Sequence, residues 1–156
     1  HKAGRANHVD GGQPAQPVTV YRNDFEDDTS ANITITDAID GKSIYLDQQV
    51  QFSKEYFFSF SPGDKDWIRA SADFRIFQKE WTSWRMTQFI LKFYEGEKQV
   101  LSNQIRVFRV LSDGETKNIC LDVSIPKRKF DRVSVLFWNS GGNKKIVIDN
   151  LKVIIF

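Results

Sequence analysis

Apolar and polar residues alternate strictly over long stretches of this chain, and this alternation narrows the possible fold classes to those built of strands. The longest example runs from Trp67 to Phe77, where the odd positions from Arg69 to Arg75 are polar and five even positions are apolar: Ile68, Ala70, Ala72, Phe74 and Ile76. Successive side chains of an extended strand point to opposite sides, so a period of two predicts a strand with one buried face. An amphipathic helix would instead repeat its apolar residues every three to four positions.

Similar alternation recurs at short intervals along the rest of the chain. Turn signals separate several of these segments, including Glu95-Gly96-Glu97, Asp113-Gly114 and Gly141-Gly142. Only Glu80–Arg85 has a helical character, and it is too short to change the fold class. The pattern predicts eight to ten strands in an all-β, two-sheet antiparallel β-sandwich of the jelly-roll type. The other expected strands are Val18–Tyr21, Ile33–Thr36, Ser43–Asp47, Thr87–Glu95, Val100–Leu111, Lys117–Ile125, Val133–Trp138 and Ile146–Phe156.

The first 17 residues differ in composition from the rest of the chain. They are almost free of apolar side chains and contain Gly11-Gly12, Pro14 and Pro17. Such a segment cannot bury enough surface to offset the entropy of ordering it. We therefore expect a disordered linker or arm over residues 1–17 and one β-jelly-roll domain over residues 18–156. Because the chain begins with His1 and opens with such an arm, we expect it to be the C-terminal part of a larger protein.

Composition limits the classes of partner. The 22 Lys and Arg side chains nearly balance the 20 Asp and Glu side chains, and the longest basic cluster is Lys127-Arg128-Lys129. Nucleic-acid binding needs a denser basic surface, so no nucleic-acid partner is expected. No apolar run approaches the ~20 residues of a membrane span. With 40% hydrophobic residues and 13 Phe, the chain can build a sizeable core without the disulfide that its single cysteine excludes.

Histidine is absent from the predicted domain, which limits the chemistry that it could perform. The two histidines, His1 and His8, both lie in the arm, and the single cysteine is Cys120. A Ser-His-Asp site, a Cys-His site and a His-based zinc site are therefore excluded from residues 18–156. Only a pair of carboxylates could still support hydrolysis, and no pattern marks such a pair. The sequence predicts a domain that is not an enzyme, although the parent protein could be one.

Motifs at both ends of the chain carry a family resemblance. Asn23-Asp24-Phe25-Glu26-Asp27 stands near the start and Ile148-Asp149-Asn150-Leu151 near the end, with Gly41-Lys42-Ser43-Ile44 and Trp67-Ile68-Arg69-Ala70 between them. In this order the motifs resemble the jelly-roll carbohydrate-binding modules of the galactose-binding-like superfamily. The resemblance covers about Val18 to Phe156 and implies the fold. It also implies carbohydrate as a partner, an extracytoplasmic location and an accessory role beside the parent protein's other domains.

The resemblance also implies a structural Ca²⁺ where the first and last strands meet. Glu26 and Asp149 stand at the matching positions, whereas Asn150 replaces a second Asp that the family commonly has. Ca²⁺ takes six to eight oxygen ligands, which carboxylates and main-chain carbonyls provide. The alternative is that Glu26 and Asp149 are separate surface carboxylates.

Carbohydrate binding calls for flat aromatic rings beside forked polar groups. The outward positions of the predicted strands supply Arg75, Asp73, Tyr94 and Trp138, and the connection before Thr87 supplies Trp81 and Trp84. Two alternatives stay open: the charged residues form a cross-strand ladder that keeps a sheet soluble, and the Trp side chains cap the core. The corresponding functions are a carbohydrate-binding-module-like domain of a surface or secreted protein, or an interaction domain of a membrane-anchored protein with the same fold and no sugar site.

Overall fold

The structure is a computed structural model, and it describes residues 14, 16–30, 32–78, 87–107, 111, 113–140 and 144–156. The predicted arm falls largely outside these ranges, as do the Gly141-Gly142 turn and the segment Glu80–Arg85. The described residues contain ten strands and no helix that is long and apolar enough to span a membrane.

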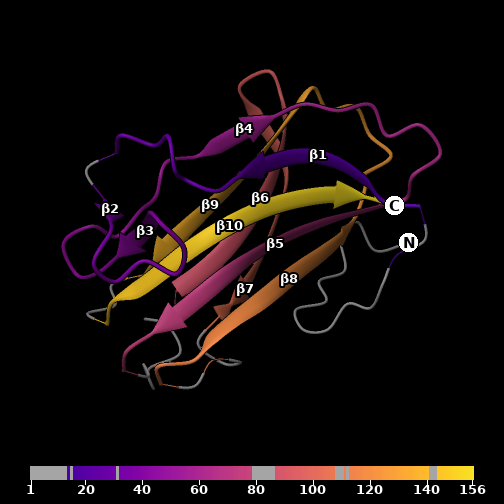
Figure 1. The fold of residues 1–156 in the computed structure, drawn as a ribbon. Helices are drawn as coiled ribbons and strands as arrows, with labels where there is room; N and C mark the ends of the chain where they lie inside the picture. The colour runs from indigo at the N-terminus through magenta and orange to yellow at the C-terminus, as the bar shows by residue number, and fades with distance from the viewer. Residues whose placement is uncertain are drawn as a thin grey trace.

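Two antiparallel sheets face each other and form a β-sandwich (Figure 1). The six-stranded sheet has the order β2-β3-β10-β5-β8, with β1 also paired to β10, and the four-stranded sheet has the order β4-β9-β6-β7. The predicted all-β, two-sheet jelly-roll fold is confirmed. The strands are β1 Val18–Asn23, β2 Ile33–Thr34, β3 Ser43–Leu46, β4 Tyr56–Phe58, β5 Trp67–Ile76, β6 Thr87–Glu95, β7 Lys98–Arg106, β8 Thr116–Ser124, β9 Arg132–Asn139 and β10 Ile146–Ile155.

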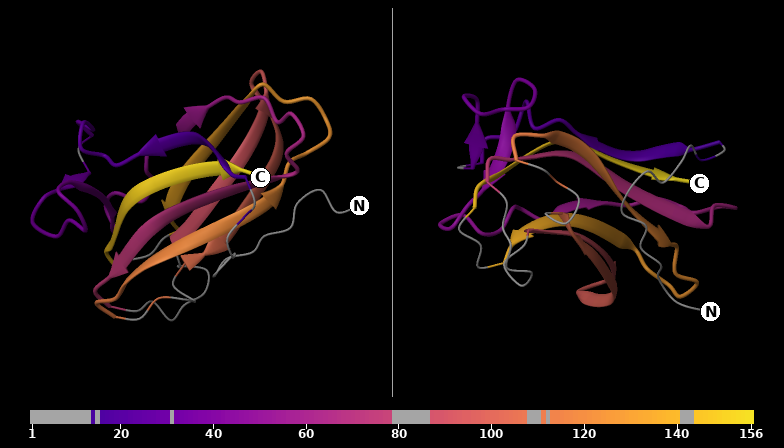
Figure 2. Two further views of the ribbon diagram at one scale, coloured as in Figure 1. Left: turned by 45° about the vertical axis from the view of Figure 1, so that its right-hand side comes forward. Right: turned by 90° about the horizontal axis from the view of Figure 1, so that it is seen from below.

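The core lies between the two layers, which Figure 2 shows one above the other. Phe74 of β5 crosses the interface and contacts Phe89 of β6 and Phe137 of β9, with ring centroids 5.4 and 5.8 Å apart. All three rings are fully buried. The alternating apolar residues of the predicted strands therefore face this core, and the pleat of each strand directs the residues between them to the opposite side.

The last strand joins the ends of the chain. One edge of β10 pairs with β5 along most of its length, while the other edge pairs with β3 over Ile146–Ile148 and with β1 over Leu151–Ile155. Between these halves the register shifts, and Asn150 adopts a left-handed backbone conformation with φ of 52°. The pairing with β1 brings the first strand beside the last one, and the bulge lies where β10 changes partner.

One strand was missing from the sequence-based prediction. Strand β4, Tyr56–Phe58, pairs with β9 although its own sequence, Tyr-Phe-Phe, does not alternate. Tyr56 and Phe58 are buried, whereas Phe57 is 41% exposed, so the strand follows the pleat with an aromatic residue on each side. Period-two analysis overlooks such a strand because it scores polarity and not ring placement.

Candidate functional site

The structure divides the predicted carbohydrate-binding residues between the two outer faces of the sandwich. Asp73 and Arg75 belong to β5 and point away from the core on the six-stranded sheet, since their neighbours Phe74 and Ile76 are buried in it. Tyr94 and Trp138 point away from the same core on the four-stranded sheet. These two pairs therefore cannot contact one small ligand together. Trp81 and Trp84 lie outside the described residues.

Trp138 takes part in an aromatic stack on the four-stranded sheet. Its ring lies parallel to that of Phe52, with 5.4 Å between centroids and 8° between planes. The two residues also form an isolated β-bridge, which fixes the position of Phe52 beside β9. Phe52 is 57% exposed. The stack therefore presents an apolar surface to solvent. The sequence pointed to Trp138 as a candidate on this face but not to Phe52.

Tyr94 forms a second aromatic group on this face. Its ring lies 5.8 Å from that of Phe57, and the Arg132 guanidinium lies over both rings at 5.2 Å and 4.3 Å. The Tyr94 hydroxyl donates a hydrogen bond to the Glu55 carboxylate, which also accepts one from the Ser134 hydroxyl at 2.6 Å. Burial, followed by the hydrogen bond to Glu55, raises the pKa of the Tyr94 phenol to about 12. The phenol is thus a fixed neutral group at physiological pH.

The pairing of β9 with β6 orders these groups along one ladder. Outward-facing pairs run from Trp138 opposite Gln88 to Arg132 opposite Tyr94, separated by Leu136 opposite Ile90 and by Ser134 opposite Lys92. Six residues of antiparallel strand span about 20 Å. We call this set of outward residues, together with Phe52 and Phe57, the aromatic face.

Buried residues lie between the two aromatic groups. Gln88, Ile90 and Leu136 are 6%, 7% and 7% exposed although they point away from the core. Arg106 of the edge strand β7 stands opposite Gln88, and its Nε atom is buried without a hydrogen-bond partner. The aromatic face therefore combines exposed rings with an unsatisfied guanidinium donor.

Asp73 and Arg75 have cross-strand partners on the opposite face. Asp73 accepts hydrogen bonds from the side-chain amides of Asn118 and Asn150, both at 2.9 Å. Arg75 donates from Nε to the Thr116 hydroxyl at 2.7 Å. Polar partners on neighbouring strands therefore hold both side chains in place.

The predicted calcium residues meet at one turn. The main-chain N–H of Lys42 donates to the Glu26 carboxylate at 3.0 Å, and that of Asp40 donates to the Asp149 carboxylate at 3.1 Å. Between them, Gly41 has φ of 48°, and a Cβ atom there would lie 2.2 Å from a Glu26 oxygen. The turn therefore holds the Glu26 carboxylate in space that only glycine leaves open.

Asp149 is a buried carboxylate, only 1% exposed. Burial raises its pKa to about 6, although hydrogen bonds from the Ser43 hydroxyl and from the N–H groups of Asn150 and Asp40 oppose the shift. The donor set around this turn consists of hard oxygens, which suits Ca²⁺. The described residues include no group of three or more His, Cys, Asp or Glu side chains able to hold a metal, so main-chain carbonyls and water would have to complete the coordination.

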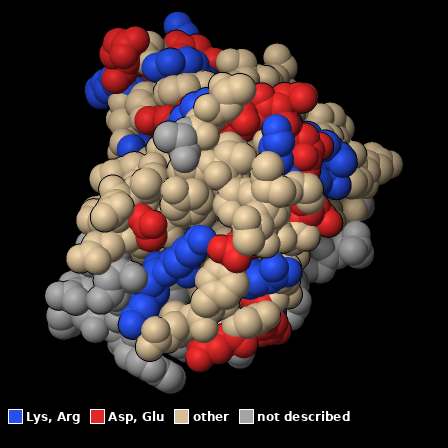
Figure 3. Space-filling view, turned by 60° about the vertical axis from the view of Figure 1, so that its left-hand side comes forward, with Lys and Arg blue, Asp and Glu red and all other residues tan. Residues whose placement is uncertain are grey.

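Charge is mixed on the side of the molecule drawn in Figure 3. Lys and Arg side chains alternate there with Asp and Glu over short distances, and uncharged residues fill much of the area between them. This distribution agrees with the near balance of charge in the sequence.

Neither a protein-family model nor a curated protein sequence matches this chain. Among solved structures, it is similar to a family 16 carbohydrate-binding module, with 15% identity, a TM-score of 0.51, and coverage of 78% of this chain and 82% of the other. It is also similar to the CBM22-1 and GH10 modules of an endo-1,4-β-D-xylanase from Clostridium thermocellum solved with xylohexaose, with 10% identity and a TM-score of 0.51. The match covers 88% of this chain and 28% of that one.

A third similar structure is the enzymatically active domain of tailspike protein 4 from bacteriophage CBA120. Its identity is 12%, its TM-score 0.53, and the match covers 99% of this chain and 20% of that one. This chain therefore spans less than a third of the second and third structures. At these identities the likeness concerns the fold, and it confirms the predicted resemblance to jelly-roll carbohydrate-binding modules at that level.

Proposed function

We propose that this chain is a non-catalytic, carbohydrate-binding-module-like domain that holds glycan on the aromatic face. The observation that carries the proposal is the exposed Phe52–Trp138 stack, which shares one outward ladder with the group of Tyr94, Phe57 and Arg132. Sugar rings present C–H groups that pack on aromatic faces, so exposed rings in fixed positions make suitable platforms.

Polar groups beside the rings support the same function. Gln88 lies opposite Trp138 in the ladder, and Arg106 lies opposite Gln88 with a buried Nε that has no partner. An amide offers both a donor and an acceptor, and a guanidinium offers several donors, which matches the paired hydroxyls of a sugar.

The domain would then serve as an accessory module of a larger extracytoplasmic protein, on the cell surface or secreted. Two of the similar solved chains are much longer than this one, with 28% and 20% of their length matched. By this proposal the chain contributes binding, and the other domains of the parent protein supply the remaining functions.

A glycan array probed with the chain tests this proposal. The wild type should bind at least one class of glycan, and Phe52→Ala and Trp138→Ala should each weaken that binding more than tenfold. Phe77→Ala is the matched control, because Phe77 is 45% exposed but contacts Lys145 rather than the aromatic face. Failure of the folded wild type to bind any glycan would reject the proposal and favour an interaction domain of a membrane-anchored protein.

We further propose that the turn at residues 40–43 holds a structural Ca²⁺ through Glu26 and Asp149. The two carboxylates come from the segment after β1 and from β10, and both bind main-chain N–H groups of that turn. A cation between them would compensate a buried charge that is otherwise costly. It would tie the start of the domain to its last strand.

A further inference from the structure

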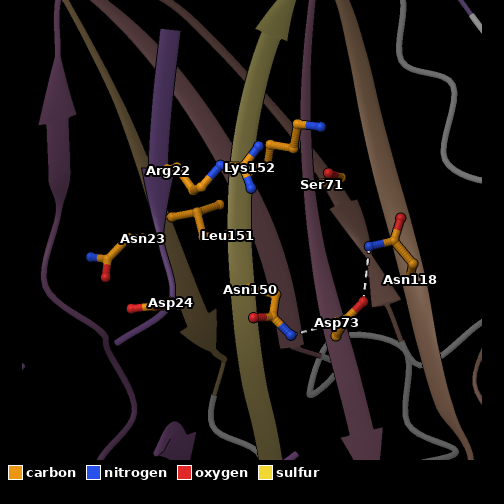
Figure 4. A pocket seen from close by; sticks show the side chains of 9 residues that line it. All are labelled: Arg22, Asn23, Asp24, Ser71, Asp73, Asn118, Asn150, Leu151 and Lys152. Atoms are coloured by element: carbon orange, nitrogen blue, oxygen red, sulfur yellow. Dashed lines mark hydrogen bonds between the residues drawn. The ribbon is translucent and has the colours of Figure 1, made fainter. Parts of the chain in front are cut away.

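A polar hollow of about 380 Å³ lies on the face opposite the aromatic face (Figure 4). It sits where β10 changes partner from β3 to β1, and it spans β1, β10, β5 and β8. Ligand pockets commonly measure about 300–1,000 Å³, so this hollow suits one or two sugar rings. No aromatic residue is among those that line it, which are Arg22, Asn23, Asp24, Ser71, Asp73, Asn118, Asn150, Leu151 and Lys152.

Two cations line one side of the hollow. Arg22 of β1 stands opposite Lys152 of β10 in the strand register, and Figure 4 shows Arg22 reaching over β10 while the Lys152 ammonium extends toward β5. Among the described residues, no ion pair joins either cation to a carboxylate. An anion in the hollow would therefore have two cations available for charge-assisted hydrogen bonds.

Hydrogen-bonding groups form the other side. Asp73 accepts from Asn118 and from Asn150, each at 2.9 Å, and Asn150 also donates to Asp40 at 2.9 Å. The left-handed backbone of Asn150 at the bulge places its side chain in this network. Each carboxylate oxygen can accept a second hydrogen bond, and each amide oxygen accepts as well. The network is therefore fixed in place with acceptors to spare for hydroxyl groups.

We propose that this hollow is a second ligand site, which binds a sugar that carries a carboxylate, such as a uronic acid residue. The carboxylate would bind Arg22 and Lys152, since charge-assisted bonds to a guanidinium are short and strong. Ring hydroxyls would donate to Asp73 and Asn118 on the other side. The site is independent of the proposed function, because it lies on the opposite sheet and uses no aromatic platform.

Titration of the ¹⁵N-labelled chain with digalacturonate, followed by NMR, tests the proposal. Saturable shifts are expected at the amides of Ser71, Asn150 and Lys152, and Arg22→Gln and Lys152→Gln should each weaken binding at least tenfold. Both variants should melt at about the same temperature as the wild type, because neither cation forms an ion pair among the described residues that the substitution would remove. Lys98→Gln, on an exposed residue of β7, is the control that should bind normally.

Neutral cellobiose and inorganic phosphate separate the alternatives. Weak or absent shifts with both, beside saturable binding of digalacturonate, would support the proposal. Equal binding of phosphate at the same amides would overturn the assignment to a sugar, and so would the absence of saturation with digalacturonate. Shifts confined to Trp138 and Tyr94 would also overturn the proposed second site. The variant Trp138→Ala should still bind digalacturonate in the hollow, so it distinguishes failure of the second site from failure of the aromatic face.

Discussion

Arg69 of β5 and Asp122 of β8 form a buried two-pronged ion pair on the outer side of the six-stranded sheet. The distances are 2.6 Å from Nε to Oδ1 and 2.8 Å from Nη2 to Oδ2, and the two residues are 7% and 5% exposed. They are direct partners in the strand register. The hydrogen bond to Asp122 raises the pKa of the Arg69 guanidinium, so Arg69 keeps its charge despite its burial.

Removing one partner of this pair should be costly. Asp122→Ala leaves a buried guanidinium charge without its carboxylate, and we expect the free energy of unfolding to fall by about 3–5 kcal/mol in urea titrations. The double variant Arg69→Met with Asp122→Leu should lose much less, because no unpaired charge remains. A single variant that loses no more than the double variant would contradict the expected cost of a buried guanidinium without its carboxylate.

Phe74→Ala should remove the ring that joins the two sheets. Phe74 contacts Phe89 and Phe137 across the core and is fully buried. Truncation of such a ring typically costs about 3–5 kcal/mol, since packing is lost and a cavity remains. Phe77→Ala is the comparison, because Phe77 is 45% exposed and should cost less than about 1 kcal/mol. Equal losses in chemical unfolding would contradict the assignment of Phe74 to the shared core.

Gly41→Ala should destabilise the turn that holds Glu26. Gly41 and Gly63 have similar positive φ angles, 48° and 57°, but only at Gly41 would a Cβ meet another group, the Glu26 carboxylate. Gly63→Ala should therefore lose about 1–2 kcal/mol for the backbone alone. Gly41→Ala should lose about 1 kcal/mol more, because Glu26 must move away and give up its hydrogen bond from Lys42. Thermal unfolding of both variants measures the difference.

Calcium should raise the melting temperature. A ligand that binds only the folded state stabilises by about 2.7 kcal/mol at 100 times its Kd, or roughly 5–10 °C for a domain of this size. Glu26→Ala and Asp149→Ala should abolish the rise. Asp64→Ala should keep it, because the Asp64 side chain is 93% exposed and distant from the turn in sequence. No rise at millimolar calcium in the wild type would exclude the proposed metal site.

Much of the fold could be predicted because burial leaves a periodic record in the sequence. The inward residues of β5 and β8, such as Phe74 and Leu121, were identified by parity and are buried as expected. The short strand β4 left no such record, because aromatic side chains occupy both of its sides. Phe52 was missed for a related reason: it belongs to no long strand and reaches the aromatic face through an isolated bridge to Trp138.

An all-β chain with a Phe-rich core follows from the amino-acid order alone, because alternation within one strand is a local property of the pleated backbone. The placement of Asp73 and Arg75 on one sheet and of Tyr94 and Trp138 on the other emerges only from the folded arrangement of the strands. Alternation shows which residues of one strand share a side. It does not show which strands pair, because pairing depends on hydrogen bonds between segments far apart in the chain. The same long-range pairing set Arg22 opposite Lys152 and brought Glu26 and Asp149 to one turn.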